Sequence, residues 1–233
     1  MLKRAVLSPA RWLSKFFLSR RTQDLVMLDL WRARARWRNR RRSGVLPLCD
    51  RLHLGCGRRK IPGWLNVDVR GSEHDVDLGS GRLPWADNVF STVISQQVIE
   101  HLDIREELIP LLRELKRTAK NGAEMWLCCP DLEKACRAYD LDRGKSLYLD
   151  ARTRSGIVLE GGMPTQYYIN DLFVQHGAHK NLFDLELLTW TLAEAGLTEV
   201  ARTTEAALLD AFPDFPRRGD DYQAIYVKVT VRK

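Results

Sequence analysis

The stretch Leu52-His53-Leu54-Gly55-Cys56-Gly57 decides the fold class, because a short apolar run leads directly into a glycine turn. A glycine turn placed directly after a strand lets the backbone approach a ligand closely, and the following N–H groups can hold an anionic group. By itself a Gly-x-Gly turn is weak evidence, since many loops contain one. Its meaning depends on the residues that follow it.

Polar residues stand at the ends of the next predicted strands. Asp68 ends the strand that follows the turn, where a carboxylate can accept two hydrogen bonds from a ribose diol. Asp77 and Leu78 follow at another strand end, and this pair suits an adenine amino group and ring face. Ser95 ends the strand after that. Because open α/β sheets bind ligands at the carboxyl ends of their strands, this order predicts a nucleotide-like ligand at one sheet edge.

Strands and helices alternate from Pro47 onward. We predict strands over 52–54, 64–69, 90–95, 124–129, 198–203 and 222–231, and helices over 103–120 and 185–195. Pro110 predicts a kink or a separate first turn in the first helix, which Asn121-Gly122 ends. The predicted fold is α/β, a Rossmann-like seven-stranded, mostly parallel sheet with an antiparallel last strand.

Residues 130–184 are too many for a plain connection between a strand and a helix. They contain several glycines, the pair Tyr167-Tyr168, and the histidines His176 and His179. Long connections inside compact domains are usually functional or disordered. We therefore predict an insertion that covers the substrate.

The basic character of the chain is confined to its first 46 residues. They hold thirteen Lys and Arg against two Asp, a net charge of +11, so that with +7 for the whole chain the remaining residues sum to −4. This split predicts a basic extension (1–46) attached to a mildly acidic domain (47–233).

The extension has the pattern of one or two basic amphipathic helices. The second, from Leu25 to Trp37, places Leu25, Leu28, Trp31 and Ala35 on one face, and an Arg cluster with Ser43-Gly44 and Pro47 follows as a linker. Interleaved Trp and Phe side chains favour an anionic membrane surface as the partner of residues 1–46. Nucleic acid, a protein partner, a disordered or solvated tail and a mitochondrial presequence are the less favoured alternatives.

Other compositional features point to a reducing compartment. The five cysteines form no C-x-x-C pair and have no zinc spacing, and no apolar run reaches the roughly 18 residues of a membrane-spanning helix. We expect free thiols and a cytoplasmic protein, peripheral on the inner face of the membrane.

Four stretches carry a family resemblance. LHLGCGRRKIPGWLNVDVR (52–70), DLGSGRLPWADNVFSTVISQQVIEHL (77–102), CCPDLEKACRAY (128–139) and HKNLFDLELLTWTLAEAGL (179–197) resemble class I S-adenosylmethionine-dependent methyltransferases. The branch they resemble is the methyltransferase type 11-like proteins associated with bacterial polysaccharide gene clusters. The resemblance covers residues 50–140 well and is more specific for fold and cofactor than for substrate.

The resemblance implies a cofactor, S-adenosyl-L-methionine, and a role for each matching residue. Gly55, Cys56 and Gly57 would surround its methionine part, Asp68 would bind the ribose, Asp77 and Leu78 would flank the adenine, and Ser95 and Gln96 would lie near the amino-acid part or the sulfonium. Glu100-His101 matches an E-H pair of the family. His53 stands where the family usually has an acid or Asn, and it is expected to contact the cofactor by hydrogen bonding.

The first functional hypothesis is methyl transfer to a hydroxyl of a glycan or a lipid-linked glycan. A small-molecule or RNA methyltransferase is the second, and a catalytically silent adaptor of the same fold is the third. The expected catalytic bases are His101, His176 and His179, with Asp131 and Glu133 as further candidates. No metal site is expected, because His176-x-x-His179 lacks a clear third ligand.

Overall fold

The computed structural model describes residues 19–40 and 44–233. The helix expected before Arg20 and Ser43 of the expected linker lie outside these residues. The strands are β1 (Arg51–Leu54), β2 (Leu65–Asp68), β3 (His74–Asp75), β4 (Phe90–Gln96), β5 (Ala119–Pro130), β6 (Glu199–Thr203) and β7 (Ala224–Thr230). The helices are α2 (Arg20–Asn39), α3 (Ile109–Thr118), α4 (Leu132–Asp142), α5 (Lys145–Ser155), α6 (Gln166–Val174), α7 (Leu185–Glu194) and α8 (Glu205–Ala211). Short helical turns are η1 (Leu78–Ser80), η2 (Ile99–His101), η3 (Ile104–Leu108) and η4 (Gln175–Gly177).

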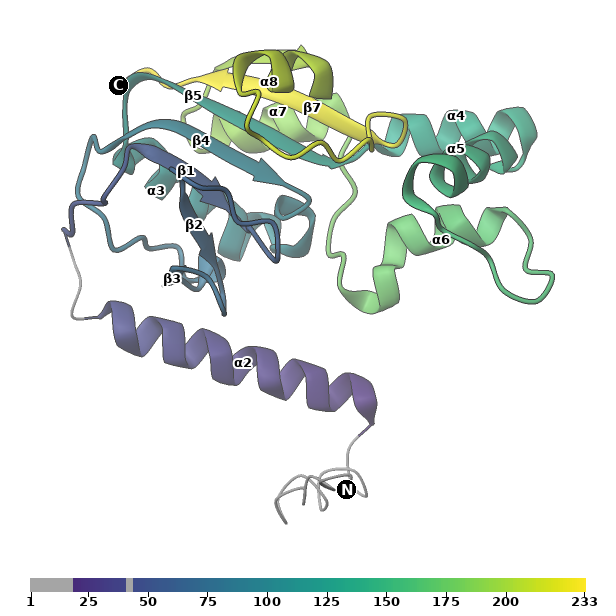
Figure 1. Cartoon of the computed structure of the whole chain (residues 1–233), viewed down its shortest axis with the longest axis horizontal. Helices are drawn as coiled ribbons and strands as arrows, with labels where there is room; N and C mark the ends of the chain where they lie inside the picture. The colour runs from purple at the N-terminus through teal and green to yellow at the C-terminus, as the bar shows by residue number, and fades with distance from the viewer. Residues whose placement is uncertain (1–18, 41–43) are drawn as a thin grey trace.

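The seven strands form one sheet in the order β3-β2-β1-β4-β5-β7-β6 (Figure 1). Strands β1 to β5 pair in parallel, and β7 runs antiparallel to both of its neighbours, β5 and β6. This sheet confirms the predicted Rossmann-like fold. The strand order changes direction between β1 and β4, which places a topological switch point at their carboxyl ends.

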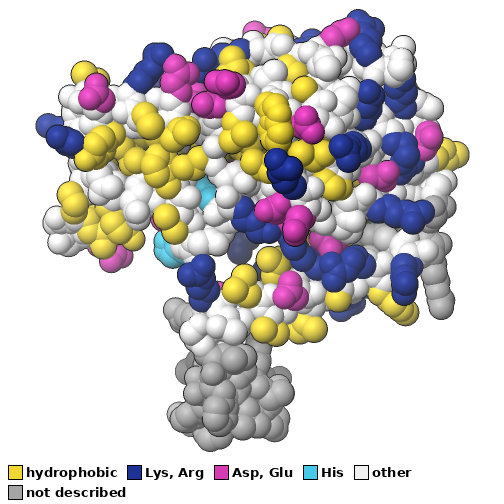
Figure 2. Space-filling model, turned by 180° about the vertical axis from the view of Figure 1, so that it is seen from behind, with side chains coloured by type: hydrophobic (Ala, Val, Ile, Leu, Met, Phe, Trp, Pro, Cys, Tyr) yellow, Lys and Arg dark blue, Asp and Glu magenta, His cyan; other side chains and the backbone are white. Residues whose placement is uncertain are grey.

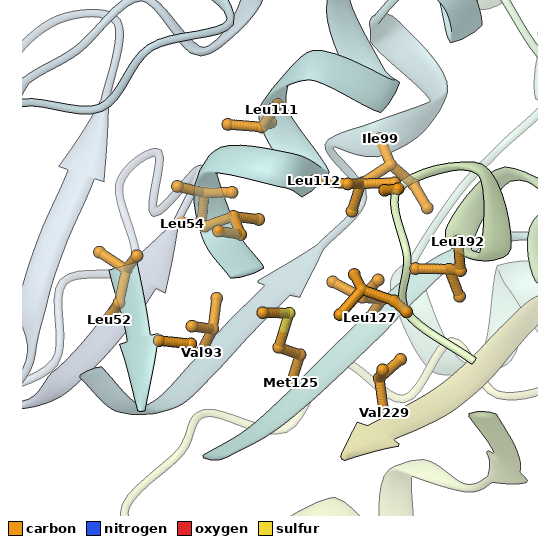
Figure 3. Packing of buried hydrophobic residues seen from close by; sticks show 14 of the residues in the cluster. Leu52, Leu54, Val93, Ile99, Leu111, Leu112, Met125, Leu127, Leu192 and Val229 are labelled. Carbon is orange, nitrogen blue, oxygen red and sulfur yellow. The ribbon is translucent and has the colours of Figure 1, made fainter. Parts of the chain in front are cut away.

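The larger apolar core lies between one face of the sheet and helices α3 and α7. Inward side chains alternate along the strands, as Leu52 and Leu54 of β1 show, and they meet Leu111 and Leu112 of α3 and Leu192 of α7 (Figure 3). Each of these five side chains is at most 1% exposed, so each contributes on the order of 2 kcal/mol of hydrophobic free energy. This packing holds the ends of β1 and β4 rigidly in register.

A second apolar cluster covers the opposite face of the sheet. Ile94 of β4 and Trp126 of β5 pack there with Trp64 and Phe215, and Leu208 of α8 closes the cluster. Trp64 and Phe215 meet edge to face with ring centroids 5.3 Å apart. Apolar side chains therefore pack against both faces of the sheet.

Two boundaries differ from the sequence-based expectation. The helix expected over 103–120 begins with the π-helical turn η3, continues as α3 with Pro110 in its first turn, and ends at Thr118. Strand β5 starts at Ala119 and not after Asn121-Gly122, because Ala119 already pairs with Phe90 of β4. The separate first turn expected from Pro110 is confirmed.

The insertion between β5 and α7 is helical. Helices α4, α5 and α6 pack on one another around their own small cluster, in which Ala138, Leu147 and Tyr168 are buried. The side chain of Asp131 caps α4 by accepting hydrogen bonds from the N–H groups of Glu133 and Lys134. Since α4 follows β5 directly, the three helices stand beyond its carboxyl end (Figure 1).

Helix α2 of the basic extension lies along the edge of the domain near β2 and β3 (Figure 1). Ala35 is 1% exposed against the domain, Leu28 and Trp31 are half-buried, and Leu25 is 53% exposed. The Arg70 guanidinium stacks 3.6 Å from the centre of the Trp31 ring. A part of the extension is therefore docked on the domain. Within residues 19–40 and 44–233, no helix combines the length and the apolar character needed to cross a membrane.

Candidate functional site

The glycine turn lies at the switch point of the sheet. Leu54, the last residue of β1, is paired with Ser95 near the end of β4, so the two strands end side by side. Gly55 and Gly57 both have positive φ, +70° and +53°, which glycine adopts at little cost. A Cβ on Gly55 would lie 2.1 Å from the Val98 side chain, whereas a Cβ on Gly57 would meet nothing within 4 Å among the described residues. Gly57 therefore faces open space in front of the strand ends.

Asp68 is joined to this turn. One carboxylate oxygen accepts a hydrogen bond from the Gly57 N–H at 2.8 Å, and the other accepts from the Val69 N–H at 2.6 Å. The side chain is half-buried. A carboxylate has about four lone-pair positions, so these two bonds leave acceptor capacity for a diol. The structure thus brings the predicted ribose-binding acid directly to the predicted methionine-binding turn.

The end of β4 contributes two buried polar side chains. Ser95 is 1% exposed and Gln96 is 5% exposed. Within the described part of the chain, the Ser95 hydroxyl and the Gln96 side-chain nitrogen have no hydrogen-bond partner. Because a buried polar group without a partner costs about 1–3 kcal/mol, such groups at a sheet edge indicate a place where a ligand supplies the partner.

Two other predicted cofactor contacts, Cys56 of the turn and His53 of β1, are buried. Cys56 is 3% exposed, and burial raises the pKa of its thiol to about 11, so the thiol is neutral and packs as a small apolar group. His53 is 4% exposed, its Nδ1 lies 3.2 Å from the Asn66 side-chain oxygen, and its ring packs edge-on against Phe215. Burial lowers the pKa of His53. A direct contact of His53 with a cofactor stays a prediction.

Asp77 forms ion pairs with two arginines of helix α2. It is 2% exposed and receives the Arg36 guanidinium at 2.6 Å, the Gly79 N–H at 3.1 Å and, more distantly, Arg32 at 3.6 Å. A cavity of about 540 Å³ opens beside it between α2 and residues 76–84, and Trp37 lines this cavity. Leu78 lies next to Asp77 and is 9% exposed. Of the predicted adenine-binding pair, Asp77 therefore lines a cavity of ligand size, and it already has cationic partners.

His101 and His179 meet, although 77 residues separate them in sequence. The backbone carbonyl of Glu100 accepts hydrogen bonds from the N–H groups of Lys180 and Asn181, at 2.8 and 3.2 Å, which ties this loop to η2. The two imidazole rings have centroids 4.8 Å apart. Their Nε2 atoms lie 3.8 Å (His101) and 3.9 Å (His179) from one Glu100 carboxyl oxygen.

Burial sets the protonation of this cluster. Glu100 is 1% exposed, and burial raises its pKa to about 8. Burial also lowers the pKa of His101 and of His179, so both rings are neutral near pH 7. The cluster therefore offers neutral imidazole nitrogens that can accept a proton.

The remaining candidate bases lie elsewhere. His176 has an 84% exposed side chain and pairs with Asp171 at 3.3 Å, so the structure does not bring it to His101 and His179. The Asp131 side chain caps α4 and forms an ion pair with Arg202 at 3.2 Å. Glu133 lies on α4 and contacts Arg137 at 2.5 Å.

Sequence reasoning missed three features of the site. Gln97 has φ of +58°, unusual for a non-glycine residue, and its side-chain amide donates to Asp220 at 3.1 Å. Val98 covers Gly55, and Glu100 was recognised only as part of a motif. Strained backbone and packing leave no pattern in a single sequence, but an acid within the apolar segment Val98–Leu102 was a detectable signal for Glu100.

No family model and no curated protein matches this sequence. Similar solved structures include a SAM-dependent methyltransferase from Aquifex aeolicus, with 14% identity over 81% of this chain and 85% of that chain and a TM-score of 0.41. A SAM-dependent methyltransferase of Thermotoga maritima, described as a possible histamine N-methyltransferase, has 16% identity over 81% and 84% of the chains and a TM-score of 0.43. A Haloferax volcanii methyltransferase solved with its Trm112 activator has 13% identity over 88% and 96% and a TM-score of 0.43. At these values the alignments assign no residue, and the site rests on the geometry of this chain.

Proposed function

We propose that the chain binds S-adenosyl-L-methionine in front of the carboxyl ends of β1, β2 and β4. The observation that carries this proposal is the contact between Asp68 and the Gly57 N–H, 2.8 Å, at the switch point of the sheet. The methionine part would lie against Gly55–Gly57 and meet the buried polar groups of Ser95 and Gln96. The ribose would bond to Asp68, and the adenine would enter the cavity beside Asp77 and Leu78.

We propose methyl transfer to a hydroxyl as the reaction. When the cofactor is bound, its sulfonium supplies an activated methyl group. The acceptor oxygen forms the new C–O bond as the C–S bond breaks, the electron pair of that bond stays on sulfur, and the hydroxyl proton passes to a base. His101 and His179 hold neutral nitrogens beside Glu100, which follows two residues after Val98, the residue that covers Gly55. Alignment of acceptor and methyl contributes the larger part of the rate, roughly 7–11 kcal/mol.

A lipid-linked glycan is the acceptor class that we propose. The sequence resemblance suggests the glycan, and the surface supports an apolar carrier. Half of the exposed large apolar side chains of the described residues lie in the helical insertion: Tyr139, Leu141, Leu149, Ile157, Val158, Met163, Tyr167 and Val174. Figure 2 shows apolar side chains gathered over this part of the molecule. Contiguous exposed apolar surface is typical of a membrane or ligand contact.

Helix α2 extends this apolar surface. Val26, Leu30 and Trp37, spaced to share one helix face, are 44%, 57% and 67% exposed. The Arg21 guanidinium lies against Gly177 of η4, so the start of α2 adjoins the end of the insertion. Basic residues flank the stripe, as on helices that lie in anionic membrane interfaces. We propose that this side of the protein binds the surface of an anionic membrane.

Formation of S-adenosylhomocysteine tests the reaction. The full chain is incubated with S-adenosylmethionine and lipid-linked glycans, and product is measured against Asp68→Ala and against a reaction without glycan. We expect glycan-dependent product that falls at least tenfold in the variant. Cofactor binding without product for any glycan, small-molecule or RNA acceptor would favour the silent adaptor.

A further inference from the structure

Three ligand atoms converge in the Glu100–His101–His179 cluster. One ligand atom from each residue lies within 4.8 Å of the others. Glu100 is 1% exposed, and neither of its carboxyl oxygens has a hydrogen-bond partner among the residues described. The side chain of His179 is 3% exposed, and its Nε2 likewise has no partner there. Buried polar atoms of this kind cost free energy unless something occupies the space between them.

The hydrogen bonds of the two rings fix which nitrogens face Glu100. Nδ1 of His101 lies 3.1 Å from the Ala178 carbonyl oxygen, and Nδ1 of His179 lies 2.6 Å from the Leu172 carbonyl oxygen. A carbonyl oxygen only accepts, so each Nδ1 carries the proton and each Nε2 presents a lone pair. The second nitrogen of a metal-binding histidine is usually held in this way.

We propose that Glu100, His101 and His179 bind a divalent transition-metal ion of the zinc type. Two imidazole nitrogens and one carboxylate oxygen form the donor set of many zinc sites, with further positions open to water or substrate. The distances from the Glu100 oxygen to the two Nε2 atoms, 3.8 and 3.9 Å, exceed by about 0.5 Å those around a tetrahedral zinc ion with bonds of about 2.1 Å, and all three ligand atoms lie within 4.8 Å of one another. Binding would draw the three side chains closer together, and His101, whose side chain is 35% exposed, gives the ion a path of entry.

The tautomers of the two rings agree with this site. Metal-bound histidine is neutral, and each ring directs the lone pair of its Nε2 atom toward the Glu100 carboxyl group. The proposed metal site depends on these three side chains and is independent of the proposed methyl transfer. A consequence for catalysis rests on the proposed function: a bound ion would lower the pKa of an acceptor hydroxyl, in place of proton uptake by the imidazoles.

Cobalt is a suitable probe, because the visible absorption of Co²⁺ reports its ligands. The untagged full chain is titrated with Co²⁺, then with Zn²⁺ in competition. We expect one equivalent to bind with an intense visible spectrum that Zn²⁺ removes. Glu100→Gln and His179→Asn should weaken binding at least tenfold, whereas His176→Asn, an exposed histidine three residues from His179, should bind as the wild type does.

Two readouts keep the test decisive if a buried variant fails to fold. His101→Asn alters the most exposed of the three ligands, and ¹⁵N resonances of the five histidines report zinc binding in the wild-type chain. Shifts confined to the Nε2 atoms of His101 and His179 support the site. An absent spectrum at millimolar Co²⁺, a thiolate charge-transfer band, or shifts of other histidines would overturn it. Cofactor affinity is measured separately, so failure here leaves the cofactor proposal standing.

Discussion

The Arg36 guanidinium lies 2.6 Å from the Asp77 carboxylate, which is 2% exposed. This contact joins the basic extension to the acid expected to bind adenine. Arg32 adds a second cation at 3.6 Å and bridges to Glu107 at 2.9 Å. Helix α2 therefore forms one wall of the cavity beside Asp77.

Removing these arginines should loosen α2. We expect Arg36→Ala to lower the free energy of unfolding by about 1 kcal/mol, because Arg32 remains near Asp77. The double variant Arg32→Ala/Arg36→Ala should cost about 3 kcal/mol, since it leaves a buried carboxylate without a cation. Urea denaturation and proteolysis of the linker measure both effects. Arg34→Ala, on the exposed side of the same helix, is the control, and equal effects of Arg34→Ala and Arg36→Ala would contradict the docking.

Low pH should weaken the contact between Arg32 of α2 and Glu107. Burial alone would raise the pKa of Glu107, but hydrogen bonds from Lys180, the Asp103 N–H and Arg32 lower it overall. The charged form is thus favoured in the folded state, so its contribution is complete above the unfolded value near 4.5 and is lost as the pH falls through the lower folded value. Glu107→Gln should flatten the loss of stability between about pH 5 and pH 3. Parallel pH profiles of wild type and variant would refute this role.

The two turn glycines should respond differently to substitution. Gly55→Ala places a methyl group 2.1 Å from Val98 at a φ of +70°, so we expect about 2–3 kcal/mol of destabilisation. Gly57→Ala meets open space and should cost about 1 kcal/mol, yet its methyl group would project into the proposed cofactor site. Thermal unfolding and cofactor titration separate the effects. Gly55→Ala combined with Val98→Ala should recover part of the stability, and no recovery would show that the turn is arranged differently.

The outward stripe of α2 should govern membrane binding. We expect Leu30→Ser/Trp37→Ser to reduce binding to vesicles that contain anionic lipid by at least fivefold, because both side chains are more than half exposed and would enter the interface. Trp190→Ser, an exposed aromatic residue of α7, is the matched control. Co-sedimentation measures both. Similar losses for both variants, or binding to RNA in place of vesicles, would count against the membrane proposal.

The sheet could be predicted because its signals are local. Strands β1, β2 and β4 are short apolar runs that end at Leu54, Asp68 and Gln96, and each of these ends was placed within one residue. Helices α4 to α6 were not predicted, because their apolar faces are short and pack in a small cluster separate from the main core. A single sequence gives weak periodicity for such helices.

The candidate site was only partly predictable. Asp68 and the glycine turn follow from their order along the chain, because parallel strands end at one sheet edge. The meeting of His101 with His179 depends on backbone hydrogen bonds between Glu100 and the Lys180–Asn181 segment, which no local pattern encodes. The pairing of Arg36 with Asp77 could not be predicted either, because no local pattern shows which carboxylate a basic residue of the extension will bind.

The most direct test of the central claim is calorimetric titration of the full chain with S-adenosylmethionine. Asp68→Ala is compared with Asp50→Ala, which removes an acid just before β1, at the opposite edge of the sheet. We predict binding by the wild type, unchanged affinity in Asp50→Ala, and at least tenfold weaker affinity in Asp68→Ala from the loss of two hydrogen bonds of about 1 kcal/mol each. No binding by the wild type at millimolar cofactor, or a folded Asp68→Ala variant with wild-type affinity, would contradict the proposed site.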